Sequence, residues 1–133
     1  MPRERTVPIR SDLDIVMARV EGRELAKELG FGVIDQARIA TAISELTRNI
    51  VQYAGEGCAT MHSIEGRGRV GIEIICQDKG PGIPDIQLAM QDGFSTSTSL
   101  GMGMPGAKRL MDEFEIESEV GMGTTVIIRR WQR

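Results

Sequence analysis

The hydrophobic pattern changes its period once along the chain, and this change constrains the fold more than any other feature. Up to about residue 53 the apolar residues recur three or four positions apart, whereas from Cys58 onward they alternate with polar ones. The first pattern is typical of amphipathic helices and the second of half-buried strands. Helices followed by strands predict an α+β fold, a two-layer sandwich with helices on one face of a mostly antiparallel sheet.

The helical part is expected to hold a short strand over residues 5–10 and two helices. Ser11 and Asp14 form a plausible start for the first helix, and Gly30 and Gly32 supply its stop. Its inward stripe consists of Ile15, Ala18, Gly22, Leu25 and Leu29. The second helix is predicted over residues 34–53, and its buried face consists of Ile39, Ile43, Leu46 and Ile50.

The second part of the chain is expected to hold strands over residues 58–64, 70–77, 113–118 and 124–131, and a short helix over 107–111. We expect Cys76 to be a buried core thiol and His62 to occupy a solvated strand position. Four glutamates, at 113, 115, 117 and 119, alternate with Phe114, Ile116 and Val120, so they should form the solvated side of a strand.

Composition excludes several classes of protein. The chain has 133 residues, of which 41% are hydrophobic, and this fits a single domain spanning residues 1–133. Its formal net charge of −3 lacks the basic footprint of a nucleic-acid binder. No apolar run approaches the roughly 18 residues that span a bilayer, so we expect no membrane segment and a cytoplasmic location.

Two polar residues of the second predicted helix lie close to its buried face. Glu45 and Asn49 lie one helical turn apart, roughly a third of a turn from the apolar stripe. An amide oxygen suits Mg²⁺, which takes few protein ligands, and a carboxylate beside a metal-bound triphosphate can orient or deprotonate an attacking hydroxyl. A solvated helix face produces the same spacing, so this pair alone is a weak signal.

A carboxylate follows the strand predicted over residues 70–77. Asp78 stands at its end, directly before Gly80 and Gly82, which allow a tight turn beneath a flat ligand. A carboxylate accepts hydrogen bonds only, so it suits the exocyclic amine of adenine and would repel the carbonyl oxygen of guanine. An ordinary turn fits the same residues equally well when they are taken alone.

The third motif is a glycine run, Gly101-x-Gly103-x-x-Gly106, which matches the dinucleotide-binding pattern by spacing alone. No hydrophobic strand precedes it, and Ala107 follows it in place of the lysine of a Walker loop, so both readings are excluded. Backbone without side chains can still approach phosphates closely where a helix begins. A flexible surface loop is the alternative interpretation.

In this order the motifs resemble the Bergerat ATP-binding fold of the GHKL superfamily, which includes gyrase, Hsp90, histidine kinases and MutL. The resemblance implies that Asp78 and Thr124 hold adenine, that Asn49 holds Mg²⁺, and that residues from about 86 to 103 form a lid over the ATP phosphates. Glu45 would be the catalytic residue. The implied nucleotide-binding set is Asn49, Asp78, Gly80, Gly82, Ile83, Leu100, Gly101, Met102, Gly103, Met104, Gly106 and Thr124.

Three longer segments, residues 43–50, 92–97 and 108–114, resemble the RsbT-type family of stressosome serine/threonine kinases. That resemblance implies phosphorylation of STAS-domain scaffold and antagonist proteins, followed by release and activation of a PP2C-type phosphatase. A second possibility is an anti-sigma-type binding module that sequesters a partner with little catalysis. The intact Glu45 and Asn49 pair favours the kinase, while the row of glutamates can serve as a docking face for the module.

Overall fold

A computed structural model describes residues 4–80 and 103–133 of the chain. The elements follow one another as β1 (Glu4–Ile9), α1 (Asp12–Glu28), α2 (Val33–Asn49), the π-helical turn η1 (Ile50–Ala54), β2 (Gly57–Gly66), β3 (Arg69–Asp78), α4 (Gly103–Leu110), β4 (Glu113–Glu119) and β5 (Gly123–Trp131).

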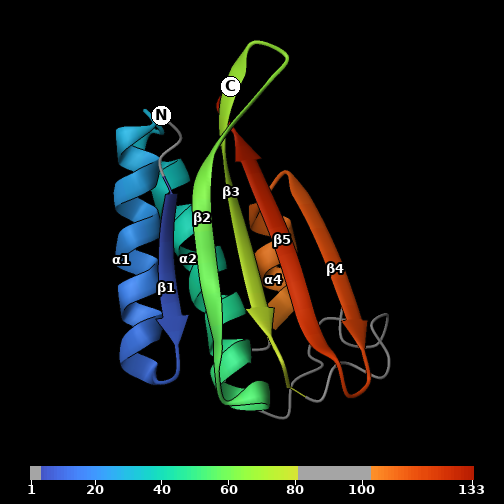
Figure 1. Ribbon diagram of the computed structural model, residues 1–133. Coiled ribbons are helices and arrows are strands. Elements are labelled where there is room, and N and C mark those ends of the chain that lie inside the picture. Colours follow the sequence, from blue (N-terminus) through green and yellow to red (C-terminus); the bar gives the residue numbers. More distant parts are fainter. Residues whose placement is uncertain (1–3, 81–102) are drawn as a thin grey trace.

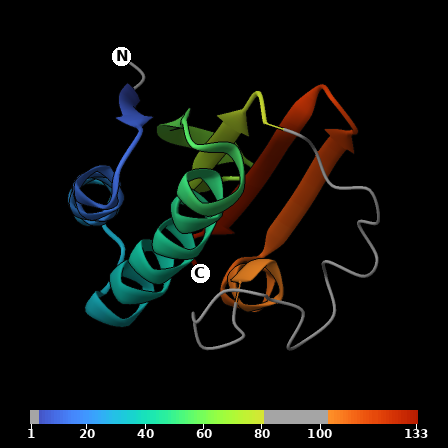
Figure 2. The same cartoon turned by 90° about the horizontal axis from the view of Figure 1, so that it is seen from below.

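The described strands form one five-stranded sheet in the order β1-β2-β3-β5-β4, and each neighbouring pair is antiparallel. The helices α1, α2 and α4 lie against one face of this sheet, and the other face is open (Figures 1 and 2). The predicted α+β sandwich is therefore confirmed. None of the helices in residues 4–80 and 103–133 has the length and apolar character needed to cross a bilayer.

The core lies between the helices and the sheet. The hydrophobic period of each helix and strand explains which of its residues are buried there. The expected stripes of α1 and α2 are buried, except that Leu29 is half-buried. Gly22 lies where α1 and α2 come close, since a Cβ at this position would lie 2.1 Å from Cδ1 of Ile43 and that side chain would have to move. Cys76 is buried as expected, and burial, together with the nearby Cys58 and Asp78, raises the pKa of its thiol to about 12.

The open face of the sheet carries a row of charged side chains across four strands. His62 Nε2 lies 2.8 Å from Glu73, and Glu73 contacts Arg129 at 2.6 Å. Arg129 also contacts Glu113 and Glu115 on β4. Desolvation would lower the pKa of Arg129, but its hydrogen bonds to Glu73 and to these two glutamates raise it. His62 does occupy a strand, but it is half-buried and paired.

The outward row of glutamates on β4 is confirmed, since all four are exposed and the alternating Phe114 and Ile116 are half-buried. The prediction that Val120 belongs to the inward set of this strand is wrong, because Val120 lies in the turn after β4 and is 70% exposed.

Two helix boundaries differ from the prediction by about four residues, whereas the strand boundaries differ by at most two. The second helix is α-helical only to Asn49 and continues as the π-helical turn η1, a change that hydrophobic spacing does not reveal. The helix predicted to begin at Ala107 begins at Gly103. Pro105 is compatible with this earlier start, because the first N–H groups of a helix have no partner within it.

A buried cation joins three parts of the fold far from one another in sequence. Arg130 of β5 is 7% exposed, and its guanidinium lies 2.9 Å from Asp35 of α2 and 3.6 Å from Asp112. It also donates a hydrogen bond to the carbonyl oxygen of Leu110 at the end of α4. Partial burial would raise the pKa of Asp112, but hydrogen bonds from Arg133 and the Trp131 amide, with the charges of both arginines, lower it.

We expect Arg130→Met to destabilise the protein by about 2–4 kcal/mol, because it leaves two partly buried carboxylates without their shared cation. Urea unfolding followed by circular dichroism measures this loss. The matched control is Arg133→Met, which removes an exposed partner of Asp112 and should cost less than about 1 kcal/mol. Equal losses in the two variants would contradict the structural role of Arg130.

Candidate nucleotide-binding site

Glu45 and Asn49 lie on α2, one turn apart, and both are half-buried. The side chain of Glu45 is 12% exposed, and its Oε1 accepts a hydrogen bond from Nη1 of Arg48 at 3.0 Å. The side chain of Asn49 forms no hydrogen bond with any residue in the described ranges. The position predicted for this pair, at the edge of the buried helix face, is confirmed.

Asp78 is the last residue of β3, as predicted. Its Oδ1 accepts a hydrogen bond from the backbone N–H of Gly80 at 2.9 Å, and this bond fixes the carboxylate relative to the turn. No described residue donates a hydrogen bond to the other oxygen. Asp78 is half-buried, so this second oxygen is an acceptor held in one place at the end of the strand.

Thr124 is the register partner of Asp78 on β5, and Ser118 of β4 is the register partner of Thr124. Ser118 Oγ donates to the carbonyl oxygen of Gly123 at 3.1 Å and lies 2.9 Å from Thr124 Oγ1. Because a serine hydroxyl has one proton, Thr124 is then the donor in the second contact, and its oxygen remains an acceptor. Sequence reasoning did not identify Ser118, because its contact depends on the register of two strands.

Close packing brings the end of α2 to the end of β3. A Cβ on Gly57, the register partner of Asp78, would lie 2.9 Å from Cγ2 of Ile50, the first residue of η1. A Cβ on Gly80 would lie 2.5 Å from Cβ of Ala54, the last residue of η1. The helix that carries Glu45 and Asn49 therefore ends against the turn that follows Asp78 (Figure 1).

Gly123 is the tightest position at this end of the sheet. Its φ angle is +94°, and a Cβ there would lie 2.1 Å from the carbonyl oxygen of Asp78. Only glycine tolerates both the positive φ and this approach. Gly123 therefore fixes the distance between Asp78 and the start of β5, which carries Thr124.

The remaining residues of the expected nucleotide-binding set lie partly outside the described ranges and partly in α4. Gly82, Ile83, Leu100, Gly101 and Met102 lie outside the described residues, as does all of the expected lid over residues 86–103 except Gly103. Gly103 opens α4, and Met104 and Gly106 belong to its first two turns. The prediction that the third glycine run adjoins a helix start is confirmed, although the helix begins inside the run.

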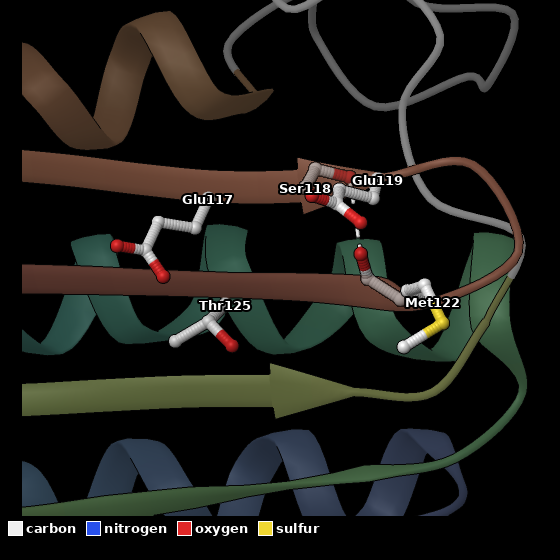
Figure 3. A pocket seen from close by; sticks show the side chains of 6 residues that line it. Glu117, Ser118, Glu119, Met122 and Thr125 are labelled. Atoms are coloured by element: carbon white, nitrogen blue, oxygen red, sulfur yellow. Dashed lines mark hydrogen bonds between the residues drawn. The ribbon is translucent and has the colours of Figure 1, made fainter.

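A hollow in the described surface lies beside the β4–β5 turn (Figure 3). It is lined by Glu117, Ser118, Glu119, Met122, Gly123 and Thr125. Glu117 and Thr125 belong to the outward set of their strands, whereas Ser118 and Thr124 belong to the inward set. The hollow contains none of Glu45, Asn49 and Asp78, so it is a neighbour of the candidate site and not the site itself.

Comparison with known proteins assigns the class. The model for the histidine kinase-, DNA gyrase B-, and HSP90-like ATPase family matches residues 34–132. This range contains all of α2 except Val33, the Asp78 turn and β5, and the chain therefore belongs to this ATPase family. The GHKL resemblance drawn from the motifs is confirmed.

Individual relatives refine this class. The chain is 57% identical over 127 residues to the serine/threonine-protein kinase RsbT of Bacillus subtilis (strain 168), covering 96% of each chain. It is 34% identical over 120 residues to an anti-sigma F factor of Thermoanaerobacter sp. (strain X514), covering 86% of this chain and 82% of the relative.

Solved structures agree on the fold. A crystal structure of the RsbU and RsbW domains of a Mycobacterium tuberculosis protein superposes with a TM-score of 0.64 and 25% identity, covering all of this chain and 33% of that chain. The mycobacterial sensor histidine kinase MprB superposes with a TM-score of 0.57 and 14% identity, covering 98% and 99% of the two chains.

Proposed function

We propose that the chain is a Mg-ATP-dependent protein serine/threonine kinase that phosphorylates STAS-domain proteins. The observation that carries the proposal is the placement of Glu45 and Asn49 on the helix that ends against the Asp78 turn. The identity to a protein named as a serine/threonine kinase, over nearly the whole of both chains, supports the same activity.

Each side chain has one task in this proposal. The oxygen of Asp78 that no described residue binds accepts a hydrogen bond from the adenine amine, and Thr124 is the register partner of Asp78 on the neighbouring strand. The amide oxygen of Asn49 is a hard ligand suited to Mg²⁺. Glu45 accepts the proton of a serine or threonine hydroxyl as that hydroxyl oxygen attacks the γ-phosphorus.

The residues at the site fit a magnesium ion that is shared with a nucleotide. Within residues 4–80 and 103–133, no cluster of three or more His, Cys, Asp or Glu side chains is able to hold a metal. An ion bound through Asn49 would therefore depend on phosphate oxygens and water for its other ligands, as Mg²⁺ at nucleotide sites usually does. The bound ion supplies neutralisation of phosphate charge.

We further propose that the kinase acts in a partner-switching pathway. It phosphorylates the scaffold and the antagonist of a stressosome in the cytoplasm, and after release it activates a PP2C-type phosphatase. The anti-sigma F relatives favour one alternative, a nucleotide-gated module that sequesters a partner with little catalysis. Both hypotheses use the same ATP site, so transfer of phosphate separates them.

The test is incubation of the full chain with Mg²⁺, ATP labelled on its γ-phosphate, and a panel of purified STAS domains. We expect label on a serine or threonine of at least one domain, located by mass spectrometry. Stable complexes that retain ATP without labelling any domain would instead support the sequestering module. A PP2C-type phosphatase assayed with and without the kinase then tests the second half of the pathway.

A further inference from the structure

Arg48 is the side chain that contacts Glu45, and the proposed reaction assigns it no role. The two residues lie three positions apart on the last turns of α2, where side chains share one helix face. Arg48 Nη1 donates to Glu45 Oε1 at 3.0 Å. The arginine side chain is 35% exposed and the glutamate side chain 12%, so the arginine is the more exposed member of the pair.

The contact distinguishes the two carboxylate oxygens of Glu45. Oε1 is engaged by the guanidinium, whereas Oε2 receives no hydrogen bond from any residue of the described ranges. A glutamate has three rotatable side-chain bonds, and a bond to one oxygen limits where the other can lie. The pair therefore leaves one oxygen available as a proton acceptor in a restricted position.

A second arginine pair on the same helix shows that this arrangement is not general. Arg38 and Asp35 are also three positions apart, but their charged atoms lie 3.8 Å apart and the arginine side chain is 48% exposed. Asp35 is bound more closely by Arg130 at 2.9 Å. Only the Arg48 pair combines a hydrogen bond with a carboxylate that lies at the candidate site.

We propose that Arg48 is a positioning residue that holds Glu45 through Oε1 so that Oε2 receives the proton of the acceptor hydroxyl. The inference rests on the proposed kinase function. As the hydroxyl oxygen forms its bond to the γ-phosphorus, the bond from that phosphorus to the β,γ-bridging oxygen breaks. The hydroxyl proton moves to Oε2 of Glu45, and the products are the phosphorylated side chain and ADP.

This role concerns the rate of transfer and leaves nucleotide binding to other residues. Arg48→Met keeps an unbranched apolar stem and removes the guanidinium, so Glu45 loses its fixed orientation. We expect the kcat for transfer to the labelled STAS domain to fall roughly 10- to 100-fold, the range typical of a misplaced catalytic group. The KM for ATP should change less than about twofold, because adenine and phosphates contact other residues.

Three further variants show whether the effect of Arg48→Met arises from the positioning of Glu45. Arg48→Lys keeps the charge and should recover part of the lost kcat, although a single ammonium does not reproduce the planar guanidinium. Arg38→Met is the matched control, since it removes the looser pair on the same helix and should leave kcat unchanged. In a Glu45→Gln background, Arg48→Met should have less than about a twofold further effect, because the group it positions is absent.

The outcomes separate this inference from the proposed function. If the wild type transfers phosphate and Glu45→Gln is slow while Arg48→Met has normal kcat, the positioning role is wrong and the kinase function stands. A raised KM with unchanged kcat, or an equal loss in the Glu45→Gln background, would also overturn it. If the wild type labels no STAS domain, the kinase function fails and the inference fails with it. Thermal unfolding of each variant verifies that the fold is kept.

Discussion

Glu45→Gln is expected to slow phosphate transfer to a STAS-domain substrate at least about 100-fold, within the range that loss of a general base produces. The change is nearly isosteric, and the amide oxygen can still accept the hydrogen bond from Arg48. It removes the ability to take up a proton. Because Glu45 is not part of the adenine end of the site, the affinity for ATP should be unchanged.

Two measurements on this variant suffice: single-turnover transfer of labelled phosphate, and titration calorimetry with Mg-ATP. The control is Glu117→Gln, which removes an exposed carboxylate on β4 and should transfer at the wild-type rate. A Glu45→Gln variant with wild-type transfer would show that another group accepts the proton. A variant that transfers slowly only because it fails to bind ATP would place Glu45 in binding and not in catalysis.

Asp78→Asn is expected to weaken ATP binding by about 1.5–3 kcal/mol, which corresponds to roughly 10- to 150-fold, because a hydrogen bond to a charged group is lost. Asparagine can still accept from the Gly80 N–H through its oxygen, so the turn should keep its shape. The amide nitrogen would then stand where the adenine amine needs an acceptor.

Calorimetry with ATP and with GTP measures this prediction. The wild type should bind ATP much more tightly than GTP, and the variant should lose most of that difference, since the carboxylate no longer repels the guanine carbonyl oxygen. Asp78→Asn with wild-type affinity and wild-type discrimination would show that adenine is recognised elsewhere. An unchanged thermal midpoint would confirm that the loss is not one of folding.

The fold was predictable because helix and strand periods differ and each element buries one face. Ile39, Ile43 and Leu46 mark the inner face of α2, and Ile50 continues that face into η1. Alternation marks the inner rows of β3 and β5. Where that pattern is weak, the prediction was less accurate. The sequence predicts a helix that begins only at Ala107, but Gly103 and Gly106 lie within α4, because the low helix propensity of glycine is a preference that tertiary packing can override.

The positions of several residues of the candidate site were predictable because their chemistry is unusual for their place in the sequence. Asp78 ends an apolar strand, and the polar Glu45 and Asn49 stand at the margin of a buried helix face. The sequence pattern alone therefore indicates the position of each residue. The structure adds that η1 brings the helix end against the turn at Gly80. Neither the π-helical turn nor this contact leaves a mark in hydrophobic spacing.

The supporting residues were missed for a different reason. Ser118 meets Thr124 through the register of β4 and β5, and Arg48 meets Glu45 through the direction of its side chain. Serine on a strand and arginine on a helix are both common, so their types carry no signal. Arg130 was assigned only to a strand, because nothing in the local sequence indicates that Asp35 and Asp112 meet there.

The central claim is that one magnesium-bound adenine nucleotide contacts both the end of β3 and the last turn of α2. Titration of the ¹⁵N-labelled protein with Mg-ATP tests it in a single NMR experiment. The side-chain amide of Asn49 and the backbone amides of Gly80 and Thr124 should shift together, with one dissociation constant and one bound nucleotide. Shifts confined to one of the two elements, or midpoints that differ between them, would contradict the claim.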